Sequence, residues 1–320
     1  MTVAGGSEMA VVRAGVVGLG GFGKHHARVL YDMGALAAVC DIVDEKATLY
    51  GRKYHVEHFT DVHKMADSGL DVAVIATPTV THAKVAYQLM AKGVKYLMLE
   101  KPFTITLSEA KELSAKAKVE GVELMVGFIE RFNQAVVVTK ELIGKQEIGT
   151  PILYFTSRVG RWPEQIFDVG VVKDTAIHDI DILRYVSEER PSQVYATTGR
   201  LVHHRHEDYA NIILNYSSGK VAIIETNWLT PRKTRRVNVT GTEGVIEADL
   251  MQQATTIMKQ DETRMPNIAF KEPLQLELQH LIECVERNAS PTPNEEDAMA
   301  ALEIAEAALN SSSMGAPIRL

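Results

Sequence analysis

The sequence predicts an α/β protein in two parts, with residues 1–128 forming a doubly wound parallel sheet and residues 129–320 an open, mainly antiparallel sheet with helices. Two observations predict the first part: short apolar runs alternate with helix-like segments, and a glycine-rich turn opens the first of those segments. The second part is predicted because, after Phe128, the apolar runs follow one another with hairpin turns between them.

The expected strands of the first part are apolar without polar alternation, which is typical of strands buried on both faces. Gly93 and Gly121 end two of the intervening helices. The strand runs are VVRAGVVG, ALAAVCD, DVAVIAT, KYLMLE and VELMVGF, and the expected helices cover 24–33, 44–53, 79–91 and 108–120.

The second part begins with a predicted helix over 130–145 and continues as strand-rich sequence. Turn signals at 217–220 (SSGK) and 241–244 (GTEG) separate strands that should pair as hairpins. A helix over 174–186 interrupts this sheet, and helices over 273–287 and 294–309 close the chain.

Composition excludes several classes of partner. The 320 residues are 46% hydrophobic and carry a net charge of −7, which argues against nucleic acid or an anionic membrane. No apolar stretch reaches the ~18 residues of a membrane span, and residues 1–10 lack the features of a secretory signal. Cys40 and Cys284 are the only cysteines, so we expect no disulfide framework and a cytoplasmic location.

The glycine turn contains Gly18, Gly20 and Gly23 between an apolar run and a helix, which is the context of a dinucleotide-binding (Rossmann) turn. Gly18 would permit the tight turn, Gly20 would let the backbone approach a pyrophosphate, and Gly23 would let helix and strand pack closely. The phosphates would then lie on the free N–H groups of the helix start. The alternative is a glycine-rich turn without a ligand.

An acid at the end of the next run supports the dinucleotide. Asp41 stands near the distance at which this fingerprint places a carboxylate for the adenosine ribose hydroxyls. A 2′-phosphate would meet like charge there, and the residues that follow, Ile42 and Val43, supply no cation. We therefore predict NAD over NADP.

Two further runs end in residues suited to the reacting end of the cofactor. Thr77-Pro78 and Glu100-Lys101-Pro102 should both lie at the carboxyl edge of the sheet, where such sheets bind ligands. Lys101 offers donors for a substrate oxygen and a cofactor ribose. The alternative is a surface salt bridge between Glu100 and Lys101. The Lys101–Pro102 bond permits the cis form.

Asp174, His178 and Asp181 are spaced so that a helix would present them on one face. A histidine beside a carboxylate can serve as a general base near neutral pH. Two alternatives remain: the three residues could ligate a metal, or Asp174 could cap the helix beside ordinary surface charge. We expect proton transfer and no metal.

Two further clusters give weaker signals: one contains histidines, which can bind metals, and the other contains basic residues. The histidines at 203, 204 and 206 are interpreted as a solvated loop. Arg232, Lys233, Arg235 and Arg236 form a basic patch, which is either the solvent face of a strand or a contact for substrate phosphate.

The segments GLGGFGKHHARVL, ATPTVTH, EKP, GFIERFNQ and DTAIHDIDIL resemble, in this order, motifs of the Gfo/Idh/MocA oxidoreductase family. The resemblance spans most of the chain and implies a Rossmann domain followed by an open sheet that carries the substrate site. It implies that Lys101 orients the reacting hydroxyl, that His178 is the acid/base and that Asp174 assists. The cofactor contacts that it implies include Phe22, Thr77, Pro78, His82, Glu100 and Lys101.

Longer segments, TSRVGRWPEQIFDVGVVKDTAIHDIDILRY and ETNWLTPRKTRRVNVTGTEG, resemble the nucleotide-sugar 3-dehydrogenases within this family. Asp168-Val169-Gly170 departs from the more glycine-rich family pattern. The resemblance implies oxidation of the 3-hydroxyl of a substrate such as UDP-N-acetylglucosamine, with Arg131, Arg158 and Arg161 available for its diphosphate. It also implies a homodimer or homotetramer formed through the C-terminal sheet.

The alternatives are a dehydrogenase of a free cyclitol or monosaccharide and a non-catalytic NAD-binding regulator. The presence of both Lys101 and His178 argues against the regulator.

Overall fold

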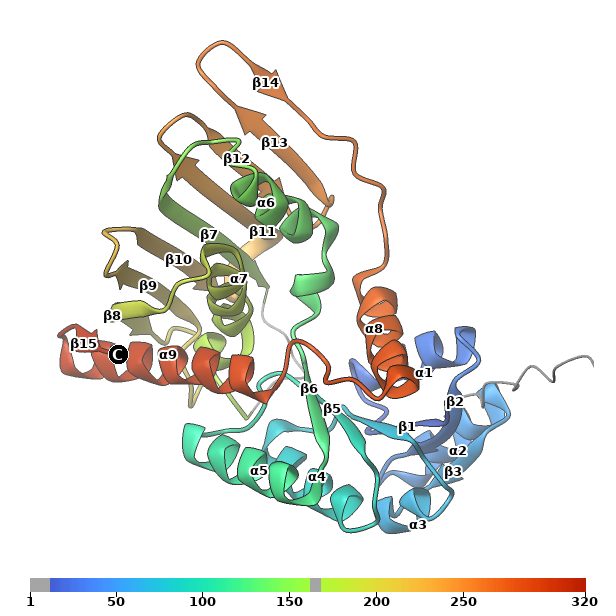
Figure 1. Ribbon diagram of the computed structural model, residues 1–320. Coiled ribbons are helices and arrows are strands. Elements are labelled where there is room, and N and C mark those ends of the chain that lie inside the picture. Colours follow the sequence, from blue (N-terminus) through green and yellow to red (C-terminus); the bar gives the residue numbers. More distant parts are fainter. Residues whose placement is uncertain (1–11, 162–167) are drawn as a thin grey trace, which may run out of the picture.

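The computed structural model describes residues 12–161 and 168–320 and contains two sheets joined by a shared layer of helices (Figure 1). Residues 1–10, assessed above for a secretory signal, and residues 162–167 of the quoted family segment lie outside the described residues.

The first sheet has six parallel strands in the order β3-β2-β1-β4-β5-β6. Its central strands are fully buried because helices cover both faces. The order reverses between β1 and β4, and such a reversal opens a crevice at the carboxyl ends of the strands. The predicted doubly wound parallel sheet is confirmed. The strands are β1 (Ala14–Val17), β2 (Leu36–Cys40), β3 (Glu57–Phe59), β4 (Val72–Ile75), β5 (Tyr96–Glu100) and β6 (Glu123–Gly127).

The helices of this half follow the predicted segments closely, and local caps explain their bounds. Helix α5 begins after Thr106, whose side chain accepts a hydrogen bond from the N–H of Glu109, and ends at Gly121 with a φ of 62°. The short elements β3 and α3 escaped prediction because they are too short to show a period. The helices are α1 (Gly23–Asp32), α2 (Asp44–Tyr54), α3 (Val62–Ala66), the turn η1 (Thr79–Thr81), α4 (His82–Met90) and α5; α5 spans Leu107–Glu120.

The second sheet has nine strands in the order β14-β13-β12-β11-β7-β10-β9-β8-β15. Strands β7 and β10 pair in parallel and the other neighbours are antiparallel, so the predicted mainly antiparallel sheet is confirmed. The strands are β7 (Pro151–Arg161), β8 (Pro191–Gly199), β9 (Tyr209–Tyr216), β10 (Val221–Asn227), β11 (Leu229–Gly241), β12 (Val245–Asp249), β13 (Ala254–Met258), β14 (Thr263–Arg264) and β15 (Ile318–Arg319).

Two helices of the second half differ from the predicted segments. The segment 130–145 is a turn, η2 (Ile129–Phe132), followed by α6 (Gln134–Gly144), because Asn133 caps α6 by accepting from the N–H of Ala135. The segment 174–186 begins as a π-helical turn, η3 (Val172–Ala176), before α7 (Ile177–Ser187). Helices α6, α7 and α9 (Glu295–Met314) cover one face of the second sheet (Figure 1).

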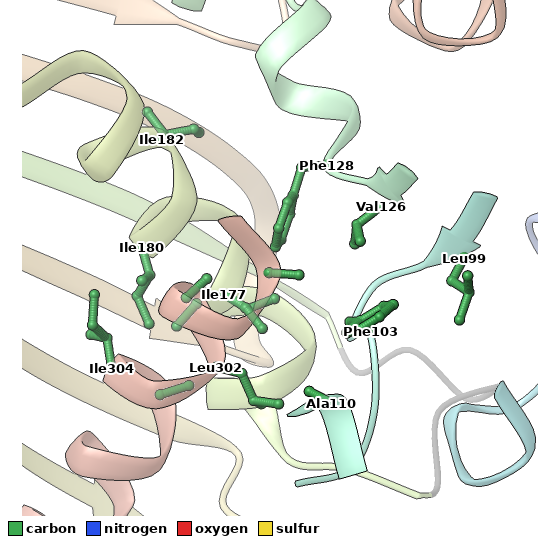
Figure 2. Packing of buried hydrophobic residues seen from close by; sticks show 14 of the residues in the cluster. Leu99, Phe103, Ala110, Val126, Phe128, Ile177, Ile180, Ile182, Leu302 and Ile304 are labelled. Atoms are coloured by element: carbon green, nitrogen blue, oxygen red, sulfur yellow. The ribbon is translucent and has the colours of Figure 1, made fainter. Parts of the chain in front are cut away.

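The C-terminal helices tie the two halves together. Helix α8 (Pro273–Arg287) packs against α1 and η2, and α9 packs against both α5 and α7. Figure 2 shows the resulting core, in which Phe103 and Val126 from the first half approach Ile177 and Leu302 from the second. This continuous core holds the ends of β5 and β6 against the start of α7, which is where the candidate site lies.

Candidate active site

The glycine turn has the shape that a pyrophosphate site needs. Gly18 has a φ of 88°, and a side chain at Gly23 would overlap the carbonyl oxygen of Gly18. A Cβ at Gly20 would meet nothing within 4 Å, so the backbone there faces open space. Helix α1 starts after Phe22 with no side-chain cap. These residues fit a bound dinucleotide phosphate at the helix start.

Asp41 connects the end of β2 to the glycine turn. Its two carboxylate oxygens accept hydrogen bonds from the N–H groups of Leu19 and Val43 at 2.8 and 2.9 Å. The neighbouring Ile42 is 90% exposed and apolar, and no lysine, arginine or histidine of the described residues forms an ion pair with this carboxylate. The arrangement fits a ribose with free hydroxyls better than a 2′-phosphate.

His82 is almost fully buried, and both of its ring nitrogens face backbone carbonyl groups. Its Nε2 lies 2.9 Å from the carbonyl oxygen of Thr77, and its Nδ1 lies 3.2 Å from that of Phe103. Burial lowers the pKa of His82, so the ring is neutral and donates through one nitrogen only. Its place in the structure indicates that it fixes the ends of β4 and β5, with Thr77-Pro78 at the crevice, and does not itself face a ligand.

Glu100 and Lys101 do not form the surface salt bridge that was the alternative. Glu100 binds Nε2 of His26 at 2.6 Å and accepts from the backbone N–H of Lys101 at 3.2 Å. Its carboxylate also packs so close to Gly127 that a larger residue there would collide with it. The Lys101–Pro102 bond is cis. Glu100 is therefore directed into the protein, toward α1.

The side-chain amine of Lys101 binds a residue of the second half of the chain. Its Nζ lies 2.6 Å from Oδ1 of Asp174 and 2.9 Å from the carbonyl oxygen of the same residue. The other oxygen of Asp174 accepts from the hydroxyl of Thr175, which in turn accepts from the indole N–H of Trp228. Thr175 and Trp228 thus orient Asp174, a role that the spacing of the sequence did not reveal.

His178 lies beside this ion pair on the first turn of α7. Its Nδ1 is buried and has no hydrogen-bond partner among the described residues. Burial lowers the pKa of His178 well below its ordinary value, and the nearby cations Lys101, Arg158 and Arg235 lower it further. The imidazole is therefore neutral at neutral pH and can accept a proton.

Asp181 does not join Asp174 and His178, contrary to the expectation of one shared face. It binds Arg131 through both oxygens, at 2.8 and 2.6 Å, on the side of α7 that faces η2. The π-helical turn before α7 shifts Asp174 out of regular α-helical register with Asp181. Asp174 is inside this turn and caps no helix.

The alternative of a metal site finds no matching cluster. Among the residues that the structure describes, no three histidine, cysteine or acidic side chains are placed to hold a metal.

Two of the three arginines expected at a substrate diphosphate are occupied inside the protein. Arg131 also binds Asp297 at 2.9 Å. Arg158 is buried and binds Asp179 and Glu130 at 2.9 and 2.8 Å. Because their charges are already balanced, the structure does not support either one as a diphosphate ligand. Arg161 is exposed and donates to the carbonyl oxygen of Pro231.

The basic patch on β11 divides between the two faces of the strand. Arg235 turns toward α7 and binds Glu130 at 2.9 Å, whereas Arg236 points to solvent. Lys233 lies on the same side as Arg235 and has no ion pair among the described residues. Partial burial and the charges of Arg235 and Arg158 lower the pKa of Lys233. Lys233 is thus a cation beside Arg235 and Arg158 that forms no ion pair within the described chain, and the sequence could not separate it from its neighbours.

The histidine-rich loop is organised by its own backbone. Nδ1 of His203 accepts from the N–H groups of Arg205 and His206, at 3.1 and 2.7 Å.

Within the described part of the chain, no helix is both long and apolar enough to cross a membrane.

A dinucleotide crevice, a lysine–aspartate pair and a neutral histidine meet at one sheet edge, an arrangement that suits an NAD-dependent dehydrogenase acting on CH–OH groups. The comparisons with known proteins identify its family. The family model described as "Oxidoreductase family, NAD-binding Rossmann fold" matches residues 12–128. A second family model, "GFO/IDH/MocA C-terminal domain", matches residues 136–247. The chain belongs to the Gfo/Idh/MocA family of sugar oxidoreductases.

The relatives include enzymes named for two kinds of substrate. The scyllo-inositol 2-dehydrogenase (NAD(+)) of Bacillus subtilis strain 168 is 33% identical over 97% of this chain and 96% of its own length. The UDP-N-acetylglucosamine 3-dehydrogenase of Acidithiobacillus ferrooxidans is 26% identical over 81% of each chain. A solved structure of the latter enzyme superimposes with a TM-score of 0.86 at 23% identity, covering 94% of this chain and 98% of that one, which shows a common fold.

Proposed function

We propose that the substrate is a nucleotide sugar, and that the protein oxidises its 3-hydroxyl to a ketone, as expected for UDP-N-acetylglucosamine. The observation that carries the catalytic part of the proposal is the ion pair of Lys101 and Asp174, 2.6 Å long, beside a neutral His178. We retain Lys101, Asp174 and His178 as the catalytic residues.

In this proposal bound NAD supplies the hydride acceptor. His178 takes the proton of the substrate hydroxyl, which a neutral imidazole can do and a charged one cannot. Lys101 donates a hydrogen bond to the same oxygen and stabilises the negative charge that develops there. Asp174 holds the amine of Lys101 in place, and its own orientation depends on Thr175.

The nucleotide part of the proposal rests on charge. Lys233 is an exposed cation of β11 with the cationic neighbours Arg235 and Arg158, and among the described residues it forms no ion pair. A substrate diphosphate would balance it, whereas a neutral sugar would leave it unpaired. The segment that contains Lys233 is one that resembles the nucleotide-sugar branch, and the relative from A. ferrooxidans acts on such a substrate by name.

A free cyclitol is the second candidate. It is favoured by the B. subtilis relative, which is named for scyllo-inositol and is more similar to this chain than the UDP-sugar enzyme is. A cyclitol needs the same Lys101 and His178 but makes no use of Lys233.

The test is to mix the protein with NAD and follow NADH absorbance. UDP-N-acetylglucosamine should reduce NAD, while scyllo-inositol, myo-inositol and glucose at the same concentration should give at least tenfold lower kcat/KM. A higher kcat/KM with an inositol would replace the nucleotide sugar by a cyclitol. NADP in place of NAD should lower kcat/KM, and equal turnover would overturn the role of Asp41.

We also propose a homodimer or homotetramer formed through the face of the second sheet that the helices leave open. Neighbouring strands place apolar side chains side by side on that face, namely Leu153, Phe155, Ile213 and Ile223. Light scattering on the native protein and on Ile223→Glu tests this, since a monomer in both cases would exclude it. A cytoplasmic location stays a prediction.

A further inference from the structure

Helix α8 carries a buried carboxyl group for which the proposed mechanism has no use. Glu277 is 0% exposed, and neither of its carboxyl oxygens has a hydrogen-bond partner in the described chain. Its helical neighbours on the same face, Leu274, Leu278 and Leu281, are part of the apolar core between α8 and the first sheet. An ionised, unpaired carboxylate in such a place would cost several kcal/mol, so the group must be neutral or must have an unseen partner.

The charged groups that face Glu277 come from the elements packed against α8, and they disfavour its ionisation. Glu100 at the end of β5 and Glu130 on η2 both repel a negative charge there. Glu130 is itself paired with Arg158 and Arg235, so these cations are already engaged. Burial and the two carboxylates raise the pKa of Glu277 well above its ordinary value. The side chain therefore keeps its proton.

A second unpartnered atom lies on the helix that faces α8. His26 of α1 is fully buried and binds Glu100 through Nε2, while its Nδ1 has no hydrogen-bond partner in the described chain. If Nε2 carries the proton that Glu100 accepts, Nδ1 is an acceptor that needs a donor. A neutral Glu277 is a donor that needs an acceptor. Because α1 and α8 are packed together, one internal water could satisfy both.

We propose that Glu277 is a positioning residue that stays protonated and donates, through an internal water, to Nδ1 of His26. This hydrogen bond fixes the tautomer in which His26 donates to Glu100. Glu100 in turn accepts from the backbone N–H of Lys101, whose side-chain amine reaches Asp174. The inference rests on the proposed role of Lys101, and it extends the site to a helix of the C-terminal segment.

The first experiment compares Glu277→Gln, Glu277→Leu and the control Glu286→Gln, which changes an exposed residue of the same helix. Gln is neutral and can donate, so kcat at pH 7 should stay within threefold of the unchanged protein. Leu is neutral and cannot donate, so kcat should fall at least tenfold although the thermal midpoint is equal or higher. A Glu277→Leu variant as active as the unchanged protein, or a Glu277→Gln variant with a thirtyfold loss, would overturn the proposal.

The second experiment needs no activity and so separates this inference from the proposed function. In protein labelled with 13C at the glutamate carboxyl carbons, one neutral carboxyl resonance should persist at pH 7 and disappear in Glu277→Gln. A spectrum in which every glutamate is ionised at pH 7 would overturn the proposal, whatever substrate the enzyme uses. If the resonance is present and no sugar or cyclitol reduces NAD, the proposed function fails and the protonation of Glu277 stands.

Discussion

Two clusters around the start of α7 contain the same kinds of residue and differ in how their charges are balanced. Toward the crevice, His178 lies beside the Lys101–Asp174 pair, and its Nδ1 has no hydrogen-bond partner in the part of the chain that the structure describes. Toward η2, Arg131 and Asp181 satisfy each other in a closed ion pair. The comparison teaches that sequence spacing alone does not separate catalytic from structural charges. We call the His178 cluster the functional side and the cluster of Arg131, Asp181 and Arg158 the structural side, although Nη2 of Arg158 also lacks a partner among the described residues.

The largest expected effect concerns the functional side. His178→Asn should lower kcat by about 10²–10⁴-fold, equivalent to about 3–5 kcal/mol, because it removes a general base. The affinity for NAD, measured by fluorescence titration, should stay within twofold, since the residue lies outside the glycine crevice. Nearly full activity of this variant would mean that another group takes the proton.

Substitutions on the structural side should lower the stability of the folded protein. Arg158→Ala should lower the free energy of unfolding by about 3–5 kcal/mol, because it leaves the buried Asp179 without a counter-charge. Urea unfolding measures this, and the exposed Arg236→Ala should change it by less than about 0.5 kcal/mol. If Arg158→Ala were as stable as the unchanged protein and failed only to bind substrate, the arginine would belong to the functional side after all.

Lys233 adds to the comparison of the two clusters because, among the described residues, no carboxylate of either cluster forms an ion pair with it. Lys233→Gln should raise KM for UDP-N-acetylglucosamine about tenfold, equivalent to about 1.4 kcal/mol, with kcat nearly unchanged. The neighbouring exposed Arg232→Gln serves as the matched control. Equal KM values in both variants would remove the main argument for a diphosphate.

The pH dependence of stability tests the functional side without measuring activity. The folded protein holds the pKa of His178 below the value of the unfolded chain, so the unfolded state binds more protons below about pH 6.5. Stability is therefore full above that pH and falls as the pH drops toward the folded pKa, by about 1.4 kcal/mol per pH unit for each such group. His178→Asn should flatten this slope by one group between pH 6.5 and 5. An unchanged slope would mean that the imidazole titrates normally.

Much of the fold could be predicted because the apolar residues follow a different spacing in each half of the chain. Continuous apolar runs separated by helices predicted the first sheet, and the glycine turn with Asp41 predicted the crevice. The bounds failed where a local event overrode the period, as at the cap Asn133 and at the π-helical turn that contains Asp174. Such events depend on a few hydrogen bonds that leave no repeating pattern.

The site could be predicted as a list of residues but not as a set of pairings. Lys101 was chosen from its position at the end of a strand and His178 from its helical spacing to Asp174. The closed pairing of Arg131, in contrast, depends on Asp297, which is far away along the chain. The alternation of β7 offered one unused signal, because Arg158 has the same parity as the buried Tyr154 and Thr156 and so faces inward.

The central claim is that Lys101 and His178 act on one hydroxyl, and a double-mutant cycle tests it most directly. Lys101→Met and His178→Asn should be compared singly and together by kcat with UDP-N-acetylglucosamine and NAD, or with whichever substrate reduces NAD. If both act on the same oxygen, the double variant should be about as slow as the slower single variant. Losses that multiply would mean that the two residues act independently and would contradict the account.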